Sequence, residues 1–387
     1  MSNYEIFNDW NELDIPEDLL RGIYNYGFEN PSSIQQKSIL SIMKGKDVIA
    51  QSQSGTGKTG SFTIGALSRV NLNIDNTQII IISPTREISN QIYEVITKIS
   101  CMMNNIKIYN LVGGNSVQDD IQYLKFNNPH IVTGCIGRIN DMIQRNLIHL
   151  DNLTTFIIDE VDEIFSNDFK HQIMDIFNQI KNYKKNNIQY VFFSATMPEL
   201  FNAMLNDLMK NPVHIIVKNE CLTLEGISQY YIALNNDYEK YLVIKDLYSS
   251  ITLSQSIIYC NSIGRVNELY ENLIKDDFPV CRLHGNMTKD ERNQSFNDFK
   301  KGKYRVLISS NITSRGIDIQ QISIVINYDL PKCKHNYLHR IGRSGRFGKK
   351  GVSINLITKR DVPIIKEIEE HYNTEINELP INFNENL

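Results

Sequence analysis

Short apolar runs recur along the first part of the chain, and segments with helical spacing separate most of them. The runs are DVIAQ, QIIIIS, IKIYNLVG, HIVTG, TTFIID, QYVFFSAT and VHIIV. Between two of them, REISNQIYEVITKIS repeats its apolar residues at the interval of about 3.6 that marks an amphipathic helix. Strands that are apolar on both faces and alternate with helices indicate a parallel sheet with helices on each side.

The same pattern starts again in the second part of the chain, with the runs SIIYCN, VCRLHG, YRVLISS, SIVINY and GVSINLI. A chain of 387 residues is too long for one ordinary core and suits two domains. The polar stretch VKNECLTLEG separates the two patterns. We therefore predict an α/β fold with one unit over residues 1–217, a linker at 218–226 and a second unit over 227–387.

Composition argues against several classes of protein. The net charge of −4 provides no broad basic field, so nucleic acid would have to be held by local basic spots and backbone amides. No apolar run is long enough to span a membrane, and the polar, acidic N-terminus is not typical of a signal or transit peptide. The six cysteines include no CxxC pair, which indicates neither a zinc site nor a disulfide framework. We expect a reducing, cytoplasmic location, which would be the host cytoplasm if the chain is viral.

The stretch SQSGTGKT, Ser52–Thr59, lies between the strand DVIAQ and the helical segment GSFTIGALSRV, which is the context that a phosphate-binding P-loop requires. Its glycines let the backbone wrap phosphate oxygens, and the N–H groups at the start of the helix point at the anion. Lys58 would reach the β- and γ-phosphates of ATP, and Thr59 would bind Mg²⁺. The first position, which is usually Gly, is Ser52. A Gly-rich turn without a ligand is the alternative. The predicted ATP-binding residues of this loop are Ser52, Gln53, Ser54, Gly55, Thr56, Gly57, Lys58 and Thr59.

A second candidate for chemistry is TTFIIDEVDEIF, in which an apolar strand ends in acidic residues. A P-loop protein needs a carboxylate for Mg²⁺ at the end of a neighbouring strand, and Asp159 fits that place. Glu160 follows it and would orient and deprotonate the attacking water. Asp162 lies two residues further on and is the weaker candidate for the metal. The alternative is a solvated helix start, where acidic side chains favour the helix dipole.

The third motif is HRIGRSGRFGKKG, in which Arg340, Arg343 and Arg346 recur at every third position, with Gly342 and Gly345 between them. An arginine near a transferring phosphoryl group stabilises the charge that develops there. Because the P-loop is in the first half of the chain and these arginines are in the second, we expect an ATP site that is complete only when the halves close on each other.

The motifs SQSGTGKT, PTRE, DEVD, SAT, RGID and HRIGRSGR occur in the order found in the DEAD-box RNA helicases, and the chain resembles that family over nearly its whole length. Within the family, LLRGIYNYGFENPSSIQQKSI, LTLEGISQYYI and RGIDIQQISIVINYDLP are most similar to eukaryotic translation initiation factor 4A. The resemblance implies two tandem RecA-like domains, each a parallel sheet flanked by helices, with a nucleotide cleft between them.

The resemblance also implies roles for single residues. Phe28 would stack on adenine, Gln35 would hydrogen-bond its edge, and Phe7 would lie nearby; a core role is the alternative for both aromatic residues. The remaining assignments are Asp318 to the ribose, Arg340 and Arg343 to the arginine fingers, and Asp162, Ser194, Thr196 and Arg346 to coupling between hydrolysis and domain closure.

RNA contacts are implied at small residues and a few polar ones, which would meet phosphates and 2′-hydroxyls without reading sequence. They are Pro84, Thr85, Arg86, Gly113, Gly114, Gly137, Arg138, Asn261, Gly285, Ser309 and Ser310. Three segments depart from the family pattern: Val161 replaces the Ala of DEAD, CIGR replaces TPGR at residues 135–138, and SSN replaces TTD at residues 309–311. The last two concern RNA more than ATP.

We therefore predict an ATP-dependent RNA helicase that works as a monomer, with ATP and Mg²⁺ as cofactors, and with a role in translation initiation on a scaffold protein. The alternative is an ATP-gated RNA clamp that hydrolyses slowly and nucleates a ribonucleoprotein complex. A DNA motor is a third possibility, which stimulation by RNA but not by DNA would exclude.

Overall fold

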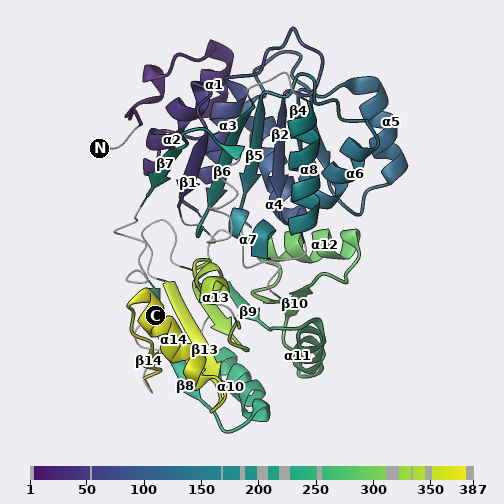
Figure 1. The fold of residues 1–387 in the computed structure, drawn as a ribbon. Coiled ribbons are helices and arrows are strands. Elements are labelled where there is room, and N and C mark those ends of the chain that lie inside the picture. Colours follow the sequence, from purple (N-terminus) through teal and green to yellow (C-terminus); the bar gives the residue numbers. More distant parts are fainter. Residues whose placement is uncertain are drawn as a thin grey trace. The chain divides into compact units, whose positions relative to one another are not determined.

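The chain divides into two compact units, Met1–Lys218 and Asn219–Leu387 (Figure 1). The computed structural model describes residues 4–52, 55–166, 169–183, 188–197, 208–217, 227–250, 255–310, 322–332, 334–344 and 351–380. The predicted linker 218–226 lies outside these residues, as do Gln53, Ser54, Asp318 and Arg346. Each unit is described by itself.

The first unit is built on a parallel sheet whose seven described strands follow the order β3-β4-β2-β5-β6-β1-β7. All seven apolar runs predicted in this part of the chain are strands. Their bounds are β1 Val48–Gln51, β2 Ile79–Ser83, β3 Ile108–Leu111, β4 Ile131–Cys135, β5 Thr155–Asp159, β6 Gln189–Ser194 and β7 Val213–Ile216.

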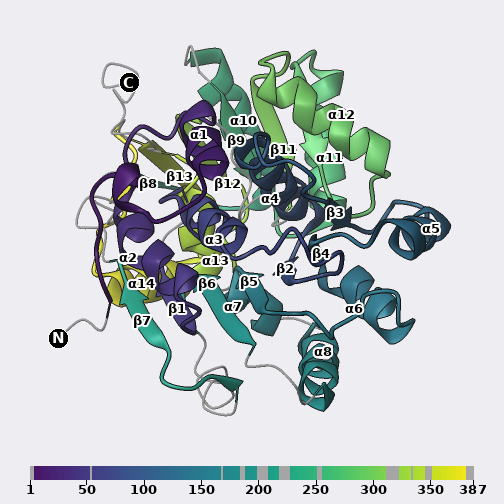
Figure 2. The same ribbon diagram turned by 90° about the horizontal axis from the view of Figure 1, so that it is seen from above.

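Helices cover both faces of this sheet. Helices α1 to α4 pack together on one face, and α6, α7 and α8 pack on the other, as Figure 2 shows. The bounds are α1 Glu17–Asn25, α2 Ser33–Met43, α3 Lys58–Leu67, α4 Arg86–Ile99, α5 Val117–Asn127, α6 Ile136–Gln144, α7 Val161–Ser166 and α8 Lys170–Asn182, with a short 3-10 helix at Trp10–Glu12. No helix in the described part of the chain is long and apolar enough to cross a membrane.

The apolar strands supply two separate cores. In β2, Ile79 and Ile81 belong to the cluster under α1 to α4, whereas Ile80 and Ile82 belong to the cluster under α6 to α8. Successive side chains of a strand point to opposite faces, so a strand covered on both sides must be apolar at every position. This requirement explains the continuous run QIIIIS.

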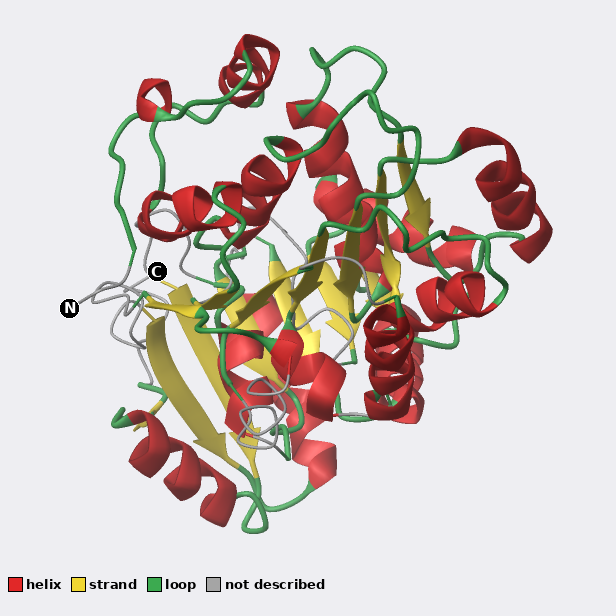
Figure 3. Cartoon of the chain, turned by 45° about the horizontal axis from the view of Figure 1, so that its top comes forward, coloured by secondary structure: helices red, strands yellow, loops and turns green. Residues whose placement is uncertain are grey.

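The second unit repeats the architecture, with the described strands in the order β10-β11-β9-β12-β13-β8-β14. Figure 3 colours the described strands of the chain yellow and the helices red. The five predicted runs are strands, and β8 and β14 were not predicted. The bounds are β8 Ile227–Ala233, β9 Ser256–Tyr259, β10 Val280–Leu283, β11 Val306–Ser309, β12 Ile324–Asn327, β13 Gly351–Ile357 and β14 Asn377–Glu378.

Its helices also lie on both faces. Helices α10 and α11 pack on one face, and α12, α13 and α14 pack on the other. The bounds are α10 Asp237–Ser250, α11 Ile263–Lys275, α12 Lys289–Lys300, α13 Lys334–Ile341 and α14 Val362–Tyr372.

Because all pairings are parallel, the carboxyl ends of the strands lie along one edge of each sheet. Ligands of open parallel sheets bind at this edge. In the first unit, β1, β5 and β6 end at the P-loop, at Asp159 and at Ser194. The topology therefore brings the predicted motifs of the first unit to a single edge.

Candidate active site

The P-loop begins where β1 ends and is tied to the neighbouring strand β6. The backbone N–H of Ser52 donates to the carbonyl of Ser194 at 3.0 Å, and its hydroxyl donates to Thr56 Oγ1 at 2.7 Å. Gly55 and Gly57 adopt left-handed φ angles of 81° and 100°, which only glycine adopts without strain. Ser52 therefore closes the loop through its side chain, which explains how it can replace the usual Gly.

Gly57 is also fixed by close packing. A Cβ atom at this position would lie 2.7 Å from Ser32 Oγ and 2.9 Å from Gln35 Nε2. Gln35 accepts a hydrogen bond from the Ser32 N–H at 2.7 Å and donates one to the Gly57 carbonyl at 3.4 Å. Gln35 thus joins the start of α2 to the P-loop, and its contact with adenine stays a prediction.

Three aromatic rings lie beside this loop. Phe28 is half-buried and stacks on Trp10, with ring centroids 6.1 Å apart and planes 20° apart. Its ring lies 2.9 Å from the position that a Cβ of Gly60 would occupy, next to the start of α3. Phe7 is only 1% exposed and packs on Trp10 within the core, which favours the core alternative for Phe7 and leaves Phe28 as the candidate for stacking on a base. The sequence reasoning did not single out Trp10.

A buried charge cluster joins the P-loop to the end of β5. Lys58 Nζ donates to Glu160 Oε1 at 3.2 Å, and both side chains are almost fully buried. Burial acts to lower the pKa of Lys58, but attraction to Glu160, Asp159 and Asp162 outweighs it, so the pKa is raised. Burial and repulsion by Glu160 together raise the pKa of Asp159 to about 7. The cluster therefore holds more negative charge than Lys58 neutralises.

The backbone at Glu160 is strained. Its φ angle is +53°, in the left-handed region that costs a residue with a side chain roughly 1–3 kcal/mol. The Glu160 N–H donates to Asp159 Oδ1 at 3.0 Å, and α7 begins at the next residue, Val161. Val161 is fully buried and packs in the core under α6 to α8, so the DEVD variant is accommodated there. The strained residue thus stands between the end of β5 and the start of α7.

Three residues predicted to couple hydrolysis to closure lie together. The Asp162 N–H donates to Ser194 Oγ at 3.2 Å, and Thr196 Oγ1 donates to Asp162 Oδ2 at 2.8 Å. These bonds connect the segment after β5 to the segment after β6. A shift of the acidic turn would therefore be transmitted to the SAT segment.

No group of three or more His, Cys, Asp or Glu side chains within the described residues forms a metal site by itself. Mg²⁺ is commonly held by one or two carboxylates together with water and substrate phosphates. The Asp159 carboxylate and the Thr59 hydroxyl are the donors that suit it, and the excess negative charge at Asp159 would be relieved by a cation.

The ends of β2, β3 and β4 place the predicted RNA residues of the first unit on the same edge. Thr85 caps α4 by accepting from the Ile88 N–H. The Arg86 guanidinium lies against Gly113, where a Cβ would meet it at 2.9 Å, and Gly114 has a φ of +90°. The glycines let Arg86 approach the backbone closely.

Arg138, another predicted RNA residue, is held by a partner that the sequence did not reveal. Its guanidinium forms an ion pair with buried Asp120 and donates to the Asn115 carbonyl at 3.2 Å. Asp120 also accepts from Tyr109 OH at 2.8 Å. No pattern in the sequence marks Asp120, because it is one of two adjacent acidic residues on α5.

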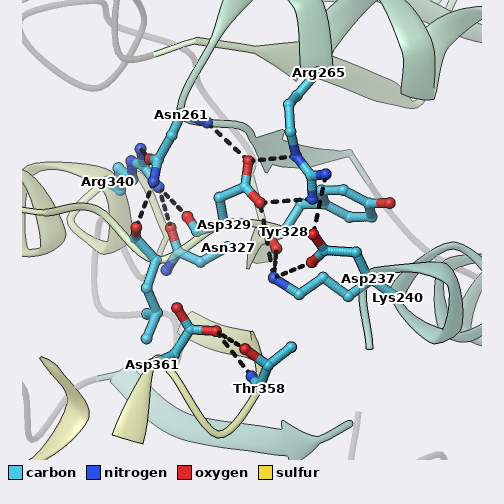
Figure 4. Close-up of polar contacts among 11 residues, drawn as sticks. Asp237, Lys240, Asn261, Arg265, Asn327, Tyr328, Asp329, Arg340, Thr358 and Asp361 are labelled. Carbon is cyan, nitrogen blue, oxygen red and sulfur yellow. Dashed lines mark hydrogen bonds and ion pairs between the residues drawn. The ribbon is translucent and has the colours of Figure 1, made fainter. Parts of the chain in front are cut away.

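Arg340, one of the two predicted arginine fingers, is held by polar groups of the second unit. Its side chain is fully buried, and it donates to Asn327 Oδ1 at 3.1 Å, to the Asp329 carbonyl at 2.7 Å and to Asn261 Oδ1 at 2.8 Å (Figure 4). It also lies over the ring of Tyr259, 5.1 Å from the centroid. These contacts hold the guanidinium inside the unit, and the role of Arg340 as an arginine finger stays a prediction.

The other predicted residues of this unit differ in exposure. Arg343 is 1% exposed, as buried as Arg340, and donates from Nε to the His339 carbonyl at 3.3 Å. Gly285 is exposed and Ser310 half-buried. Ser309 is fully buried, and its hydroxyl donates to the Leu283 carbonyl at 2.9 Å, so its contact with RNA stays a prediction.

Comparisons with known proteins agree with this geometry. Residues 32–203 match the family model of the DEAD/DEAH box helicase, and residues 239–348 match that of the helicase conserved C-terminal domain. The chain is similar to an ATP-dependent RNA helicase eIF4A of Aspergillus fumigatus, with 46% identity over 382 residues that cover 98% of this chain and 93% of the relative. It is also 46% identical to the ATP-dependent RNA helicase fal1 of Schizosaccharomyces pombe, over 97% of this chain and 94% of that one.

Two solved structures have the same fold. S. cerevisiae Dbp5 bound to RNA and ADP BeF3 superimposes with a TM-score of 0.87 at 31% identity, over 97% of this chain and 96% of that chain. Mss116p bound to ssRNA and AMP-PNP gives a TM-score of 0.88 at 25% identity, over 98% of this chain and 80% of that chain.

Proposed function

This chain is a member of the DEAD/DEAH box helicase family, and we propose that it is an ATP-dependent RNA helicase, an RNA-stimulated ATPase that separates short duplexes locally. The observation that carries the proposal is the buried contact of Lys58 with Glu160 between a P-loop and a strained turn. The family provides the class of reaction, and this cluster provides its residues.

The cluster accounts for the hydrolysis step in physical terms. Lys58 is charged and close to Glu160, and the phosphates of ATP would draw its ammonium away from that carboxylate. Glu160, released from the ion pair, is then free to orient water and to accept its proton as the water attacks the γ-phosphorus. Repulsion between the Glu160 and Asp159 carboxylates contributes to the raised pKa of Asp159.

We propose that ATP is bound with Mg²⁺, held by Asp159 and Thr59. Three acidic side chains act on Lys58, and burial together with repulsion by Glu160 raises the pKa of Asp159. A divalent cation bound here would neutralise charge on the phosphates. Glu160 would remain available as the base, because Asp159 and Thr59 would hold the metal.

The RNA side of the proposal rests on the solved relatives, which are bound to RNA, and on the residues that gather at the ends of β2, β3 and β4. Similarity to eIF4A supports a function in translation initiation. We also propose that the protein works as a cytoplasmic monomer on a scaffold protein and binds RNA without sequence preference, because the predicted contacts are to the backbone.

The steady-state ATPase rate tests this proposal, measured with no nucleic acid, with single-stranded RNA and with DNA of the same sequence. Stimulation by RNA alone is expected. Equal stimulation by DNA would indicate a different motor, and absence of stimulation would contradict the RNA-dependent ATPase. A Lys58→Ala variant is the matched control, because it should lose nucleotide affinity without losing the fold of the second unit.

A second candidate function is an ATP-gated RNA clamp, and the ion pair of Arg138 with Asp120 favours it. The pair with Asp120 fixes the Arg138 guanidinium in one orientation, and a contact that is already ordered favours holding RNA over releasing it. Arg138 belongs to the segment in which CIGR replaces TPGR. Slow turnover with long RNA retention in the presence of ATP would identify the clamp. Rapid turnover with release of one strand from a short duplex would identify the helicase.

A further inference from the structure

Three residues of the second unit form a closed ring of hydrogen bonds, shown in Figure 4. The Asn261 N–H donates to Asp329 Oδ2 at 3.0 Å, and Asn261 Oδ1 accepts from Arg340 Nη2 at 2.8 Å. The ring closes where Arg340 Nη1 donates to the Asp329 carbonyl at 2.7 Å. Each member therefore contacts the other two, and none can move without disturbing both.

The Asp329 carboxylate is the anchor of this ring. Arg265, from the first turn of α11, donates to it through two nitrogens, Nε at 3.1 Å and Nη2 at 2.8 Å. Lys240, from α10, lies 3.7 Å from Oδ1 and donates to the Tyr328 carbonyl at 2.9 Å. A bidentate arginine contact fixes a carboxylate in orientation as well as in charge. The Asp329 carboxylate thus joins α10 and α11 to the turn after β12.

The ring connects two segments with different expected functions. Asn261 follows β9 at the carboxyl edge of the sheet and is a candidate RNA contact. Arg340 lies in α13, and the Arg343 N–H donates to the Arg340 carbonyl at 3.2 Å in the turn that follows. Arg343 is the candidate for stabilising the phosphoryl group. The position of Arg343 therefore depends on Arg340, which depends in turn on Asn261 and Asp329.

We propose that Asp329 is a positioning residue that couples RNA contact at Asn261 to the placement of Arg343, so that RNA raises the rate of ATP hydrolysis through this ring. The inference rests on the proposed function. Asp329 touches neither RNA nor ATP; it acts by holding the Asn261 backbone and the Arg340 guanidinium in one arrangement.

The ring also explains why Arg340 remains buried with its charge. Burial lowers the pKa of Arg340 to about 10, so it stays protonated at neutral pH. Arg340 donates hydrogen bonds to uncharged oxygens of Asn261, Asn327 and the Asp329 backbone. These bonds stabilise the positive charge without neutralising it. A charged side chain in this environment is sensitive to small displacements of its partners.

The test compares Asp329→Asn with Asp237→Asn in the full chain. Asparagine keeps the size of the side chain but removes the charge and can no longer accept from both Asn261 and the Arg265 fork. Asp237 meets the same two cations, Lys240 and Arg265, at 3.4 Å each but is mostly exposed and does not contact the ring. The measurements are ATP affinity, the ATPase rate without RNA, and the maximal rate and half-saturating concentration with single-stranded RNA.

Asp329→Asn is expected to lower the stimulation by RNA about tenfold while ATP affinity stays unchanged. Asp237→Asn is expected to stay within about twofold of the parent protein in every measurement, because exposed ion pairs contribute little. Normal stimulation in folded Asp329→Asn would overturn the inference. Stimulation lost to the same degree in both variants would also overturn it, because the whole charge cluster would then be responsible. A parent protein that does not respond to RNA would instead contradict the proposed function.

A double-mutant cycle separates coupling from a general loss of structure. If Asp329 acts through Asn261, the losses in stimulation caused by Asp329→Asn and Asn261→Ala should not add. Additive losses would overturn the inference. Should Asp329→Asn not fold, as judged by thermal unfolding, Arg265→Lys provides the second variant, because lysine keeps the charge and loses the fork. It is expected to lower RNA stimulation in the same direction and to leave ATP affinity unchanged; unchanged stimulation would count against the inference.

Discussion

At the scale of single residues, Glu160 combines strain, burial and a charged partner in one side chain. Its φ of +53° strains the backbone, and its carboxylate forms a buried ion pair with Lys58. We expect Glu160→Gln to bind ATP normally and to lower the turnover rate by roughly 10²–10⁴, the usual contribution of a general base. A radiolabelled or coupled ATPase assay, together with a nucleotide-binding titration, measures both quantities.

Glu163→Gln is the matched control, because Glu163 lies in the first turn of α7, just after Glu160, and does not act on Lys58 in the buried cluster. It should hydrolyse ATP at the parent rate. If Glu160→Gln retains turnover, another group must accept the proton from water.

Phe28 is the second residue whose role can be isolated. Its ring is half-buried beside the P-loop helix and stacks on Trp10, the only tryptophan in the chain. Stacking on a base is worth about 1–3 kcal/mol, so Phe28→Leu should weaken ATP binding by about tenfold or more. Intrinsic fluorescence of Trp10 during an ATP titration reports the change. Tyr24→Leu, on the exposed face of α1, should leave both the affinity and the fluorescence response unaltered.

At the scale of elements, the apolar runs predicted the strands well because a parallel strand covered on both faces has no freedom to be polar. The exceptions are instructive. The strand β8 reads ISQYYIA, and several of its side chains are only half-buried, because its outer neighbour β14 has just two residues. A strand near the edge of a sheet can be polar, and its sequence then no longer distinguishes it from a loop.

The sequence predicted the site residues that belong to motifs, but not the partners that hold other residues in place. Lys58, Asp159 and Glu160 were identified because the P-loop and the acidic turn have fixed spacing. The environments of Arg138 and Arg340 were not, since the partners Asp120 and Asp329 lie 18 and 11 residues away along the chain and carry no motif. Sequence gives the type of a side chain, whereas its exposure and its partners depend on the packing of neighbouring elements.

The start of β4 offers a prediction about stability. His130 is buried, and its Nδ1 accepts a hydrogen bond from the Lys107 N–H at 3.0 Å. Burial lowers the pKa of His130, and the effects of Asp75 and Lys107 are smaller. Because the unfolded chain takes up this proton below about pH 6.5 and the folded one resists it, the contribution of His130 to stability is present at higher pH and is lost as the pH falls.

Asparagine can mimic the accepting atom without titrating, so His130→Asn should narrow the difference in melting temperature between pH 7.5 and pH 5.5. Thermal unfolding of both proteins at the two pH values measures it. If the melting temperatures of the parent protein and the variant fall by the same amount on acidification, His130 does not contribute to acid sensitivity.

At the scale of the whole molecule, binding of ATP and RNA should be linked. If a nucleotide analogue raises the affinity for RNA by some factor, RNA must raise the affinity for the analogue by the same factor. Factors of about 5–150 are typical. Anisotropy of labelled RNA with and without AMP-PNP gives one side of this comparison, and a nucleotide titration with and without RNA gives the other. RNA affinity that does not respond to AMP-PNP would contradict the linkage, whereas Lys58→Ala should abolish the response through loss of nucleotide.

The order of the strands in the first unit has a consequence for how the protein is made. The strand that leads into the P-loop, β1, pairs only with β6 and β7, which lie more than 130 residues later in the chain. During synthesis, β1 therefore leaves the ribosome early, and it can pair in the sheet only after almost the entire unit has been synthesised. A nascent chain that ends before Ile216 should be unable to hold ATP, whatever helices it has already formed. Nucleotide binding would then mark the moment at which synthesis of this unit has produced a finished fold.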